Sequence, residues 1–414
     1  MNSAAAGRPR RGRDGSGVSL PFLVSALIAG HAISSMAVLV LPAVAPVVAR
    51  EYGVDASLIG YQVSLVTFGM LASLAMLGNL SRKLGGSRVN QIGHILVGTG
   101  MLLMLLPSAI FLMAGSLALG VGYGLLTPSA AHLLLRFTPD ARRNFVFSLH
   151  QASLPFGGLL AAVAAPWIAV TVGWRWSVAL NAVLVFSVVA LMQLRRADWD
   201  DDRDCAHLAV APNPFTCVTA IWRVRDLRLV SLAGGLLCWV QFCVLSFAVV
   251  VCVELLAMDL VVAGTMLLVA LLGSVAGRLL AGAIADAVGR PKRVLAVIAG
   301  LTAATCIAAA WLAPSWPLPL VYALFTWFGM TSGGWTGVLF VEAGRLVPTG
   351  QANVTFSGAL VYVNLGKLIG TIVFANVYAL SRSYGFAYAT AAVPALIAVY
   401  CLLAADRGNR HTIH

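Results

Sequence analysis

Apolar residues along this chain come in long runs, and polar and charged residues gather in short clusters between them. The runs are about 18 to 29 residues long, enough for one helix to cross a hydrocarbon layer of roughly 30 Å. They are rich in Ala, Gly, Val and Leu and lack the long alternation of barrel strands, so each predicts a helix. Twelve spans are predicted, at residues 20–48, 56–77, 89–106, 109–135, 144–170, 176–194, 229–253, 260–281, 294–313, 317–341, 352–378 and 384–405.

Composition agrees with this pattern. The 414 residues are 60% hydrophobic and 10% charged, whereas a soluble domain is about half apolar and a quarter charged. A water-soluble fold is therefore excluded. We predict an all-α membrane protein with 12 transmembrane helices.

The basic residues predict the orientation. If the first span starts in the cytoplasm, 22 of the 27 Lys and Arg residues lie on the cytoplasmic side, 3 lie on the other side and 2 lie within spans. Cytoplasmic loops carry such an excess of Lys and Arg, so both termini are expected in the cytoplasm, as in a bacterial inner membrane protein. The net charge of +12 thus reflects orientation and does not indicate nucleic-acid binding.

A polar segment divides the chain into two sets of six spans. We expect a basic cytoplasmic tail at 1–19, an N-terminal six-helix bundle at 20–194, a cytoplasmic linker at 195–228, a C-terminal six-helix bundle at 229–405 and a second tail at 406–414. Two similar loops, beginning at Gly78 and Gly282, occupy the same position in each half, as expected of an internal repeat.

Two cations are predicted to lie inside the membrane. Lys367 is at the middle of the segment 356–378, roughly 15 Å from either edge and beyond the reach of a lysine side chain. It must face protein or water, and Asn364, Ser357 and Thr371 form a polar stripe with it on an otherwise apolar helix. Arg278 is nearer the cytoplasmic end of its span, so it could also extend to the interface or serve as a structural partner.

None of the 15 acidic residues is at mid-membrane; Glu254 and Glu342 come nearest, each at the end of a span. Two buried cations without a buried carboxylate suggest that the ligand supplies the negative charge. An anionic small molecule is the simplest candidate. The same lack of a buried acid favours exchange or facilitated transport over proton symport.

The loop from Gly282 to Arg293 resembles the Gly-x-x-x-Asp-x-x-Gly-Arg-x-Lys/Arg-Lys/Arg signature of the major facilitator superfamily. The resemblance covers the chain from about residue 20 to 405 and implies a transporter with two six-helix bundles. It also implies a gating loop in which Gly282 permits close helix approach, Asp286 caps a helix or pairs with Arg, and Gly289 allows a tight turn before Arg290. The first copy of the loop departs from the pattern, because Arg82 replaces the usual Asp, and Ser116 replaces an arginine linked to proton coupling.

The two cations are similar to those of the oxalate–formate antiporter and monocarboxylate transporter branches. There an arginine four residues before the motif glycine binds carboxylate, and Arg278 has this spacing from Gly282. A Tyr-x-x-x-x-Lys-x-x-Gly context supplies the second cation in the oxalate–formate branch, and Tyr362, Lys367 and Gly370 reproduce it. Ser274 stands where proton-linked monocarboxylate carriers have Asp, which again speaks against proton symport by a carboxylate.

Other side chains could line the same cavity. Trp327, Thr331 and Trp335 have the spacing of one helix face, and Tyr123 lies among glycines. His31 could bind substrate or carry a proton, because histidine titrates near neutral pH. For Trp327, Thr331, Trp335 and Tyr123, packing inside the bundle is the favoured interpretation. For His31, a hydrogen-bonded position in the core is equally acceptable.

We therefore expect a carrier of small organic anions, with Lys367 and Arg278 as the main binding residues and Asn364, His31, Tyr123, Trp327 and Trp335 as further lining residues. An exporter of neutral or amphipathic compounds, such as drugs or siderophore-like metabolites, is the alternative. An enzyme or receptor is disfavoured, since the sequence has no HExxH motif, no buried carboxylate pair and no appended soluble domain. No cofactor, metal or nucleic-acid partner is expected, and a 12-helix chain could work as a monomer.

Overall fold

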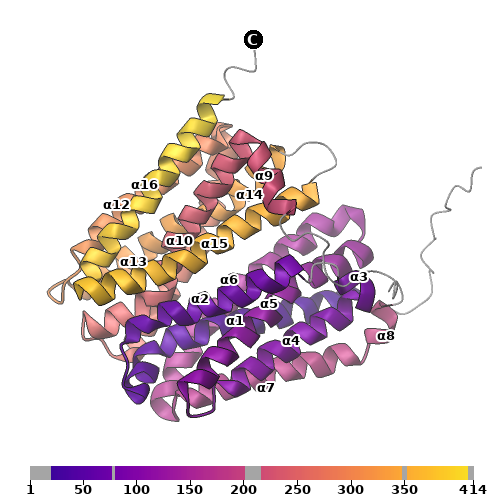
Figure 1. Ribbon diagram of the computed structural model, residues 1–414, viewed down its shortest axis with the longest axis horizontal. Coiled ribbons are helices and arrows are strands. Elements are labelled where there is room, and N and C mark those ends of the chain that lie inside the picture. The colour runs from indigo at the N-terminus through magenta and orange to yellow at the C-terminus, as the bar shows by residue number, and fades with distance from the viewer. Residues whose placement is uncertain (1–19, 77–79, 201–215, 347–351, 409–414) are drawn as a thin grey trace, which may run out of the picture.

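The computed structural model describes residues 20–76, 80–200, 216–346 and 352–408. Every regular element in these ranges is a helix (Figure 1). The helices are α1 Leu20–Tyr52, η1 Ala56–Leu58, α2 Ile59–Met76, α3 Leu80–Leu84, α4 Gly86–Leu103, α5 Ala109–Phe137, α6 Asp140–Thr171, α7 Trp174–Gln193, α8 Arg196–Trp199, α9 Thr216–Arg223, α10 Arg225–Glu254, α11 Leu260–Val288, α12 Pro291–Ala310, α13 Leu318–Gly333, α14 Trp335–Arg345, α15 Ala352–Ser381 and α16 Tyr384–Gly408. The predicted tail at 1–19, most of the other tail and the linker residues 201–215 lie outside the described ranges.

Within these ranges, 10 helices are long and apolar enough to cross a membrane. The predicted spans at 89–106 and 317–341 do not meet this standard. The first corresponds to α4, an 18-residue helix that begins Gly-Ser-Arg, and the second is divided between α13 and α14. The all-helical membrane fold is confirmed, whereas the count of twelve spans stays a prediction.

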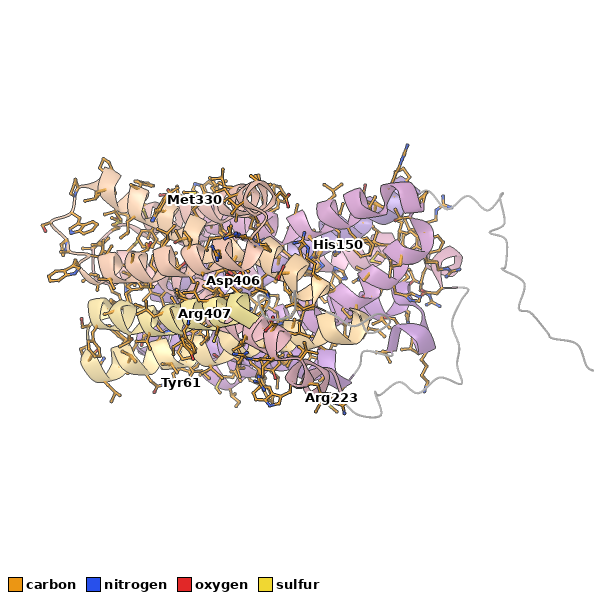
Figure 2. The ribbon with its side chains drawn as sticks, turned by 90° about the horizontal axis from the view of Figure 1, so that it is seen from above. Tyr61, His150, Arg223, Met330, Asp406 and Arg407 are labelled. Atoms are coloured by element: carbon orange, nitrogen blue, oxygen red, sulfur yellow. The ribbon has the colours of Figure 1, made fainter. Side chains whose placement is uncertain are left out.

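The helix predicted over 317–341 is present as α13 and α14, and Gly334 between them keeps helical backbone angles, with φ of −68° and ψ of −20°. At this junction between α13 and α14, α11 packs closely against the chain. A Cβ atom added at Gly277 of α11 would lie 2.2 Å from the carbonyl oxygen of Met330, a residue labelled in Figure 2. Small residues let the two backbones approach, and the junction leaves carbonyl groups near the end of α13 without an intrahelical donor.

The helices form two groups that pack mainly within themselves (Figure 1). Helices α1 to α7 make up the N-terminal bundle, drawn in indigo to magenta, and α10 to α16 make up the C-terminal bundle, drawn in red to yellow. Three pairs of helices make most of the contacts between the bundles: α1 with α10, α2 with α15, and α6 with α11. Smaller contacts join α2 with α10 and α1 with α11. We call the end of the molecule where α1 begins and α16 ends the terminal half, and the opposite end the far half.

The apolar core differs between the two halves. In the far half one core includes residues of both bundles, such as Val44 of α1, Val249 of α10 and Phe374 of α15. In the terminal half each bundle has a separate core. One contains only residues of the C-terminal bundle with the adjoining α9, and the other contains residues of the N-terminal bundle together with Trp199 of α8. The bundles are therefore joined through the far half and packed independently in the terminal half.

The start of the linker is hydrogen-bonded to the N-terminal bundle. The Asp200 carboxylate accepts hydrogen bonds from the backbone amides of Ser87 (2.7 Å) and Arg88 (2.9 Å), in the first turn of α4. Arg136 of α5 donates to the carbonyl oxygen of Trp199 at 3.0 Å, and the Trp199 ring is fully buried. Asp200 thus supplies the acceptors that the first amides of α4 lack within their own helix.

Candidate functional site

Lys367 and Arg278 lie at the level where the shared core gives way to the two separate cores. On α15, Val363 belongs to the core of the C-terminal bundle and Phe374 to the shared core, and Lys367 lies between them. On α11, Arg278 lies between Leu271 of the shared core and Ala281 of the separate core. Both cations are therefore placed at the closed end of the region in which the bundles pack independently.

Lys367 is almost completely enclosed, with 5% of its surface exposed. Its Nζ atom lies 4.1 Å from the centroid of the Phe242 ring of α10. The face of an aromatic ring attracts a cation through its quadrupole, most strongly where water is excluded. This contact offsets part of the cost of burying the ammonium group, but a ring does not neutralise the charge.

Arg278 is half-buried and points toward the junction between α13 and α14. Its Nε atom donates to the carbonyl oxygen of Gly333 at 3.3 Å, and Thr336 donates to the same oxygen at 3.2 Å. The junction therefore provides an acceptor that a continuous helix would use internally. One donor of the guanidinium group is engaged in this way, and the group has four further N–H donors.

The two cations share a neighbour in Cys238 of α10. In the part of the chain that the structure describes, neither cation forms an ion pair with a carboxylate. Removing a charge from water costs several kcal/mol unless a partner offsets it. The arrangement has an excess of positive charge that an anion of small size could balance.

The bundles touch directly beyond Lys367. The hydroxyl groups of Ser64 on α2 and Thr371 on α15 are 2.7 Å apart, and Ser64 also donates to the carbonyl oxygen of Leu368 at 2.9 Å. A Cβ atom added at Gly60 would lie 2.4 Å from the carbonyl oxygen of Thr371. Thus α2 and α15 close the far side of the site, one turn away from the lysine.

The family is decided by a comparison of the sequence with family models. The model described as Major Facilitator Superfamily matches residues 27–371. The chain belongs to the major facilitator superfamily. It is therefore a membrane-embedded transporter of small molecules and not an enzyme.

Solved transporter structures share the fold of this chain, and curated relatives match part of its sequence. A peptide transporter POT in complex with sulfate superposes with a TM-score of 0.72 and 15% identity, covering 96% of each chain. A D-xylose–proton symporter gives a TM-score of 0.74 and 13% identity, covering 92% of this chain and 96% of the other. Synaptic vesicle 2-related proteins of Bos taurus and Xenopus laevis are 25% and 24% identical over 171 and 160 residues, 40% and 37% of this chain. The match spans only about a third of their length, 31% and 29% respectively.

The loop that resembles the superfamily signature has the expected turn but not the expected close approach. Gly289 ends α11 in the left-handed region with φ of 66°, a conformation that favours glycine. Gly282, in contrast, has open space where a Cβ atom would lie, so it permits no close helix contact in this conformation. Asp286 and Arg290 are exposed, and among the described side chains Asp286 forms no ion pair. Their role in gating stays a prediction.

The predicted aromatic face of the tenth span is not formed. Trp327 is 45% exposed in an apolar stripe with Leu320, as expected of a lipid-facing position, whereas Trp335 is buried. The two indole rings lie on either side of Gly334, one in α13 and the other in α14. The Trp335 Nε1 atom has no hydrogen-bond partner among the described residues. Asn364 is buried one turn from Lys367, and its amide donates to the carbonyl oxygen of Leu360 at 2.8 Å.

His31 and Tyr123 belong to the N-terminal bundle, and the structure brings them to each other. The Tyr123 hydroxyl oxygen lies 3.5 Å from Nε2 of His31, and both side chains are buried. Their depth matches that of the two cations, since His31 lies between Leu27 of the N-terminal core and Met36 of the shared core. No contact between these two residues and Lys367 or Arg278 is present among the described side chains.

Several residues of this region were not singled out from the sequence. Phe242 and Cys238 look like ordinary apolar residues of a span, and only the packing of α10 against α15 reveals their position beside Lys367. His150 of α6 packs against His31, although 119 residues separate them. Its position within an apolar stretch was a signal that could have been used.

An ion pair joins the two bundles in the far half. Its loss should favour the conformation in which the far half is separated. Arg382, after α15, donates to Asp55, before α2, at 2.8 Å, and thus joins the C-terminal to the N-terminal bundle. Members of this superfamily work by rocking one bundle against the other. We expect Arg382→Gln to raise the population with a separated far half by about 1.4- to fivefold, because exposed pairs contribute about 0.2–1 kcal/mol.

Distances between spin labels on the far ends of α1 and α11 would measure this shift. The matched control is Arg175→Gln, which removes an exposed ion pair with Glu51 inside the N-terminal bundle. That pair does not join the bundles, so its loss leaves the distances unchanged. Equal shifts in the two variants would mean that the Asp55 pair has no special role in holding the far half closed.

Proposed function

We propose that this chain transports small organic anions, most simply carboxylates, by alternating access. The observation that carries the proposal is the position of Lys367 and Arg278, two cations without a carboxylate partner among the described residues, at the closed end of the region between the bundles. The anion would bind between them. The positive charge of the site disfavours cationic drugs, whereas amphipathic neutral compounds stay the alternative substrate class.

The chemistry of the two cations supports a small ligand. A carboxylate can accept from the free N–H donors of Arg278 and from Nζ of Lys367 at once, and charge-assisted hydrogen bonds of this kind are short and strong. Cys238 and Phe242 would pack beside it and keep water away. The low dielectric constant of the site strengthens the attraction between the anion and each cation. The anion therefore offsets the cost of burying two positive charges.

The same proposal includes the orientation and the mode of transport. We place the terminal half on the cytoplasmic side of a bacterial inner membrane, because most basic residues lie there. The conformation described above is then inward-facing. Exchange of one anion for another, by a monomer, needs nothing beyond the two cations and the rocking of the bundles.

Exchange in proteoliposomes tests the substrate class. Vesicles would be loaded with unlabelled oxalate, formate, lactate, succinate or benzoate, and entry of the labelled form of the same anion would be followed. We expect at least one carboxylate to enter many times faster than into protein-free vesicles. If none of them moves while the protein protects cells against lipophilic toxic compounds, the anion proposal is wrong and export of such compounds replaces it.

A further inference from the structure

The N-terminal bundle contains a cluster of buried histidines at the depth of the two cations. It consists of His31 of α1, His94 of α4 and His150 of α6, with Tyr123 of α5 beside them, and we call it the histidine cluster. Each histidine is at most 4% exposed. Figure 2 shows His150 in the N-terminal bundle.

The central contact of the cluster is between two imidazole rings. The centroids of His31 and His150 are 4.7 Å apart, with the rings nearly perpendicular at 79°. Tyr123 lies on another side of His31, with ring centroids 5.5 Å apart and its hydroxyl oxygen 3.5 Å from Nε2. Two imidazole rings so close together repel each other when both are charged, so the pair can hold one added proton but not two.

The tautomer of His94 is fixed by a hydrogen bond, unlike those of His31 and His150. Its Nδ1 atom lies 2.8 Å from the carbonyl oxygen of Asn90, which is an acceptor only, so Nδ1 carries the proton and Nε2 does not. Gly30 of α1 makes room for this ring, since a Cβ atom there would lie 2.5 Å from Nε2. His94 is a neutral neighbour that packs the cluster against α4.

The pair has unused proton-binding capacity. Among the described residues, Nδ1 of His31, Nε2 of His150 and also Nε2 of His94 have no hydrogen-bond partner, although all three atoms are buried. A buried polar atom without a partner is costly and is rarely kept without a function. The described residues contain no group of three or more His, Cys, Asp or Glu placed to hold a metal ion.

Among the side chains that the structure describes, none that faces the pair carries a negative charge. The titratable groups that face the pair are His94 from α4 and Tyr123 from α5. The other charged groups of α1 and of the helices packed on it lie at helix ends, as with Glu51 of α1 and Arg175 of α7 in the far half. On the opposite bundle, α11 contributes Arg278. The uncharged titratable groups on α10 are Cys238, Cys243 and Cys252, and α2 contributes the exposed Tyr61.

We propose that His31 and His150, assisted by Tyr123, bind one proton that is transported together with the anion. This inference rests on the proposed function, because the anion is what makes the proton favourable. Without it, a protonated imidazole would be buried in a molecule that already holds two uncompensated cations. An anion between the bundles lowers the positive charge that a proton on the pair would meet, so each ligand increases the affinity for the other by the same factor.

Tyr123 can form a hydrogen bond with His31 whether or not Nε2 of His31 carries a proton. In the neutral state its hydroxyl group donates to Nε2 of His31. When a proton is added at Nε2, the hydroxyl group rotates and its oxygen accepts the new N–H, since a phenol is both donor and acceptor. The proton comes from water on the open side and leaves to water when the other side opens, and no other bond is formed or broken.

The first test measures proton uptake by the purified wild-type protein. Lactate would be added to the protein in weakly buffered detergent solution with a pH indicator, in parallel with chloride at the same ionic strength. We expect uptake of about one proton for each lactate bound, because the imidazole pair accommodates a single added charge. Lactate binding without proton uptake would overturn the inference and leave the anion proposal intact.

The second test uses variants in proteoliposomes. Wild-type protein should concentrate labelled lactate by up to about tenfold across a gradient of one pH unit, since one proton moves with each monoanion. His31→Gln and His150→Gln should lose this accumulation, with a ratio near one once the labelled lactate has equilibrated. His132→Gln, which changes a histidine of α5 outside the cluster, should accumulate as the wild type does.

The outcomes separate the two proposals. Accumulation that survives in both cluster variants means that the proton is carried elsewhere or not at all, and the inference fails while anion transport stands. If the wild type exchanges no lactate or other carboxylate, the proposed function itself fails, and the role of the cluster in anion coupling fails with it.

Discussion

Lys367→Met is expected to slow carboxylate exchange by about 30-fold or more at low anion concentration. The change removes one of two cations from the site and leaves an unbranched side chain that fills similar space. Removing one member of a buried charge pair costs about 2 kcal/mol or more, and every 1.4 kcal/mol corresponds to a factor of ten. Labelled exchange in proteoliposomes over a range of anion concentrations would measure the effect.

The chain offers clear controls for this variant. Lys83→Met removes a lysine of α3, a short helix that contributes no residue to the site, and should exchange at the wild-type rate. Lys367→Arg keeps the charge and should retain more exchange than Lys367→Met. If Lys367→Met exchanges every carboxylate as fast as the wild type, the lysine is outside the substrate path and has a structural role in the cation–π contact with Phe242.

Gly366→Ala is expected to destabilise the C-terminal bundle. A Cβ atom at Gly366 of α15 would lie 1.8 Å from the carbonyl oxygen of Gly235 of α10, so one backbone must move away from the other. Overpacking of this kind costs about 1–3 kcal/mol. The movement would also displace the neighbouring Lys367 from Phe242, so anion binding should weaken together with the melting temperature in detergent.

Gly300→Ala is the matched control for this substitution. Gly300 lies in the helix α12, and nothing is within 4 Å of the position that its Cβ atom would take. Both substitutions gain helix propensity, up to about 1 kcal/mol, because alanine is the better helix former. Gly300→Ala should therefore melt at or above the wild-type temperature and Gly366→Ala below it. The reverse order would show that the close packing of α10 and α15 adds no stability.

The candidate site was predictable to different degrees. Lys367 could be identified from the sequence because a charge far from any water must be functional or paired, whatever its neighbours are. Its aromatic partner Phe242 could not be identified from the sequence, because about 125 residues separate Phe242 from Lys367 and many phenylalanines occupy similar apolar stretches. The junction of α13 and α14 beside Arg278 was not predicted either, since Gly333 and Gly334 are tolerated inside continuous membrane helices as well.

For the histidines, too, the sequence does not show which residues lie in contact. His31 was a candidate for proton or substrate binding, but a lone histidine on an apolar helix has no recognisable partner. The contact with His150 gives it one, and that contact depends on how α1 packs against α6. The expectation that proton symport is disfavoured considered only carboxylates as proton carriers. In our proposal an imidazole pair carries the proton instead.

The sequence by itself determined that this chain is a helical membrane protein, which loops carry its basic residues, and which two cations lie within its spans. These features follow from the transfer of single residues between water and lipid, a property of local composition. Only the tertiary structure decided that the bundles share a core in the far half and separate in the terminal half, and that Lys367, Arg278 and the histidine cluster lie at that boundary. Inside a membrane, apolar surfaces are equally satisfied by lipid or protein, so hydropathy does not specify which helix faces which, and close packing and hydrogen bonds decide it.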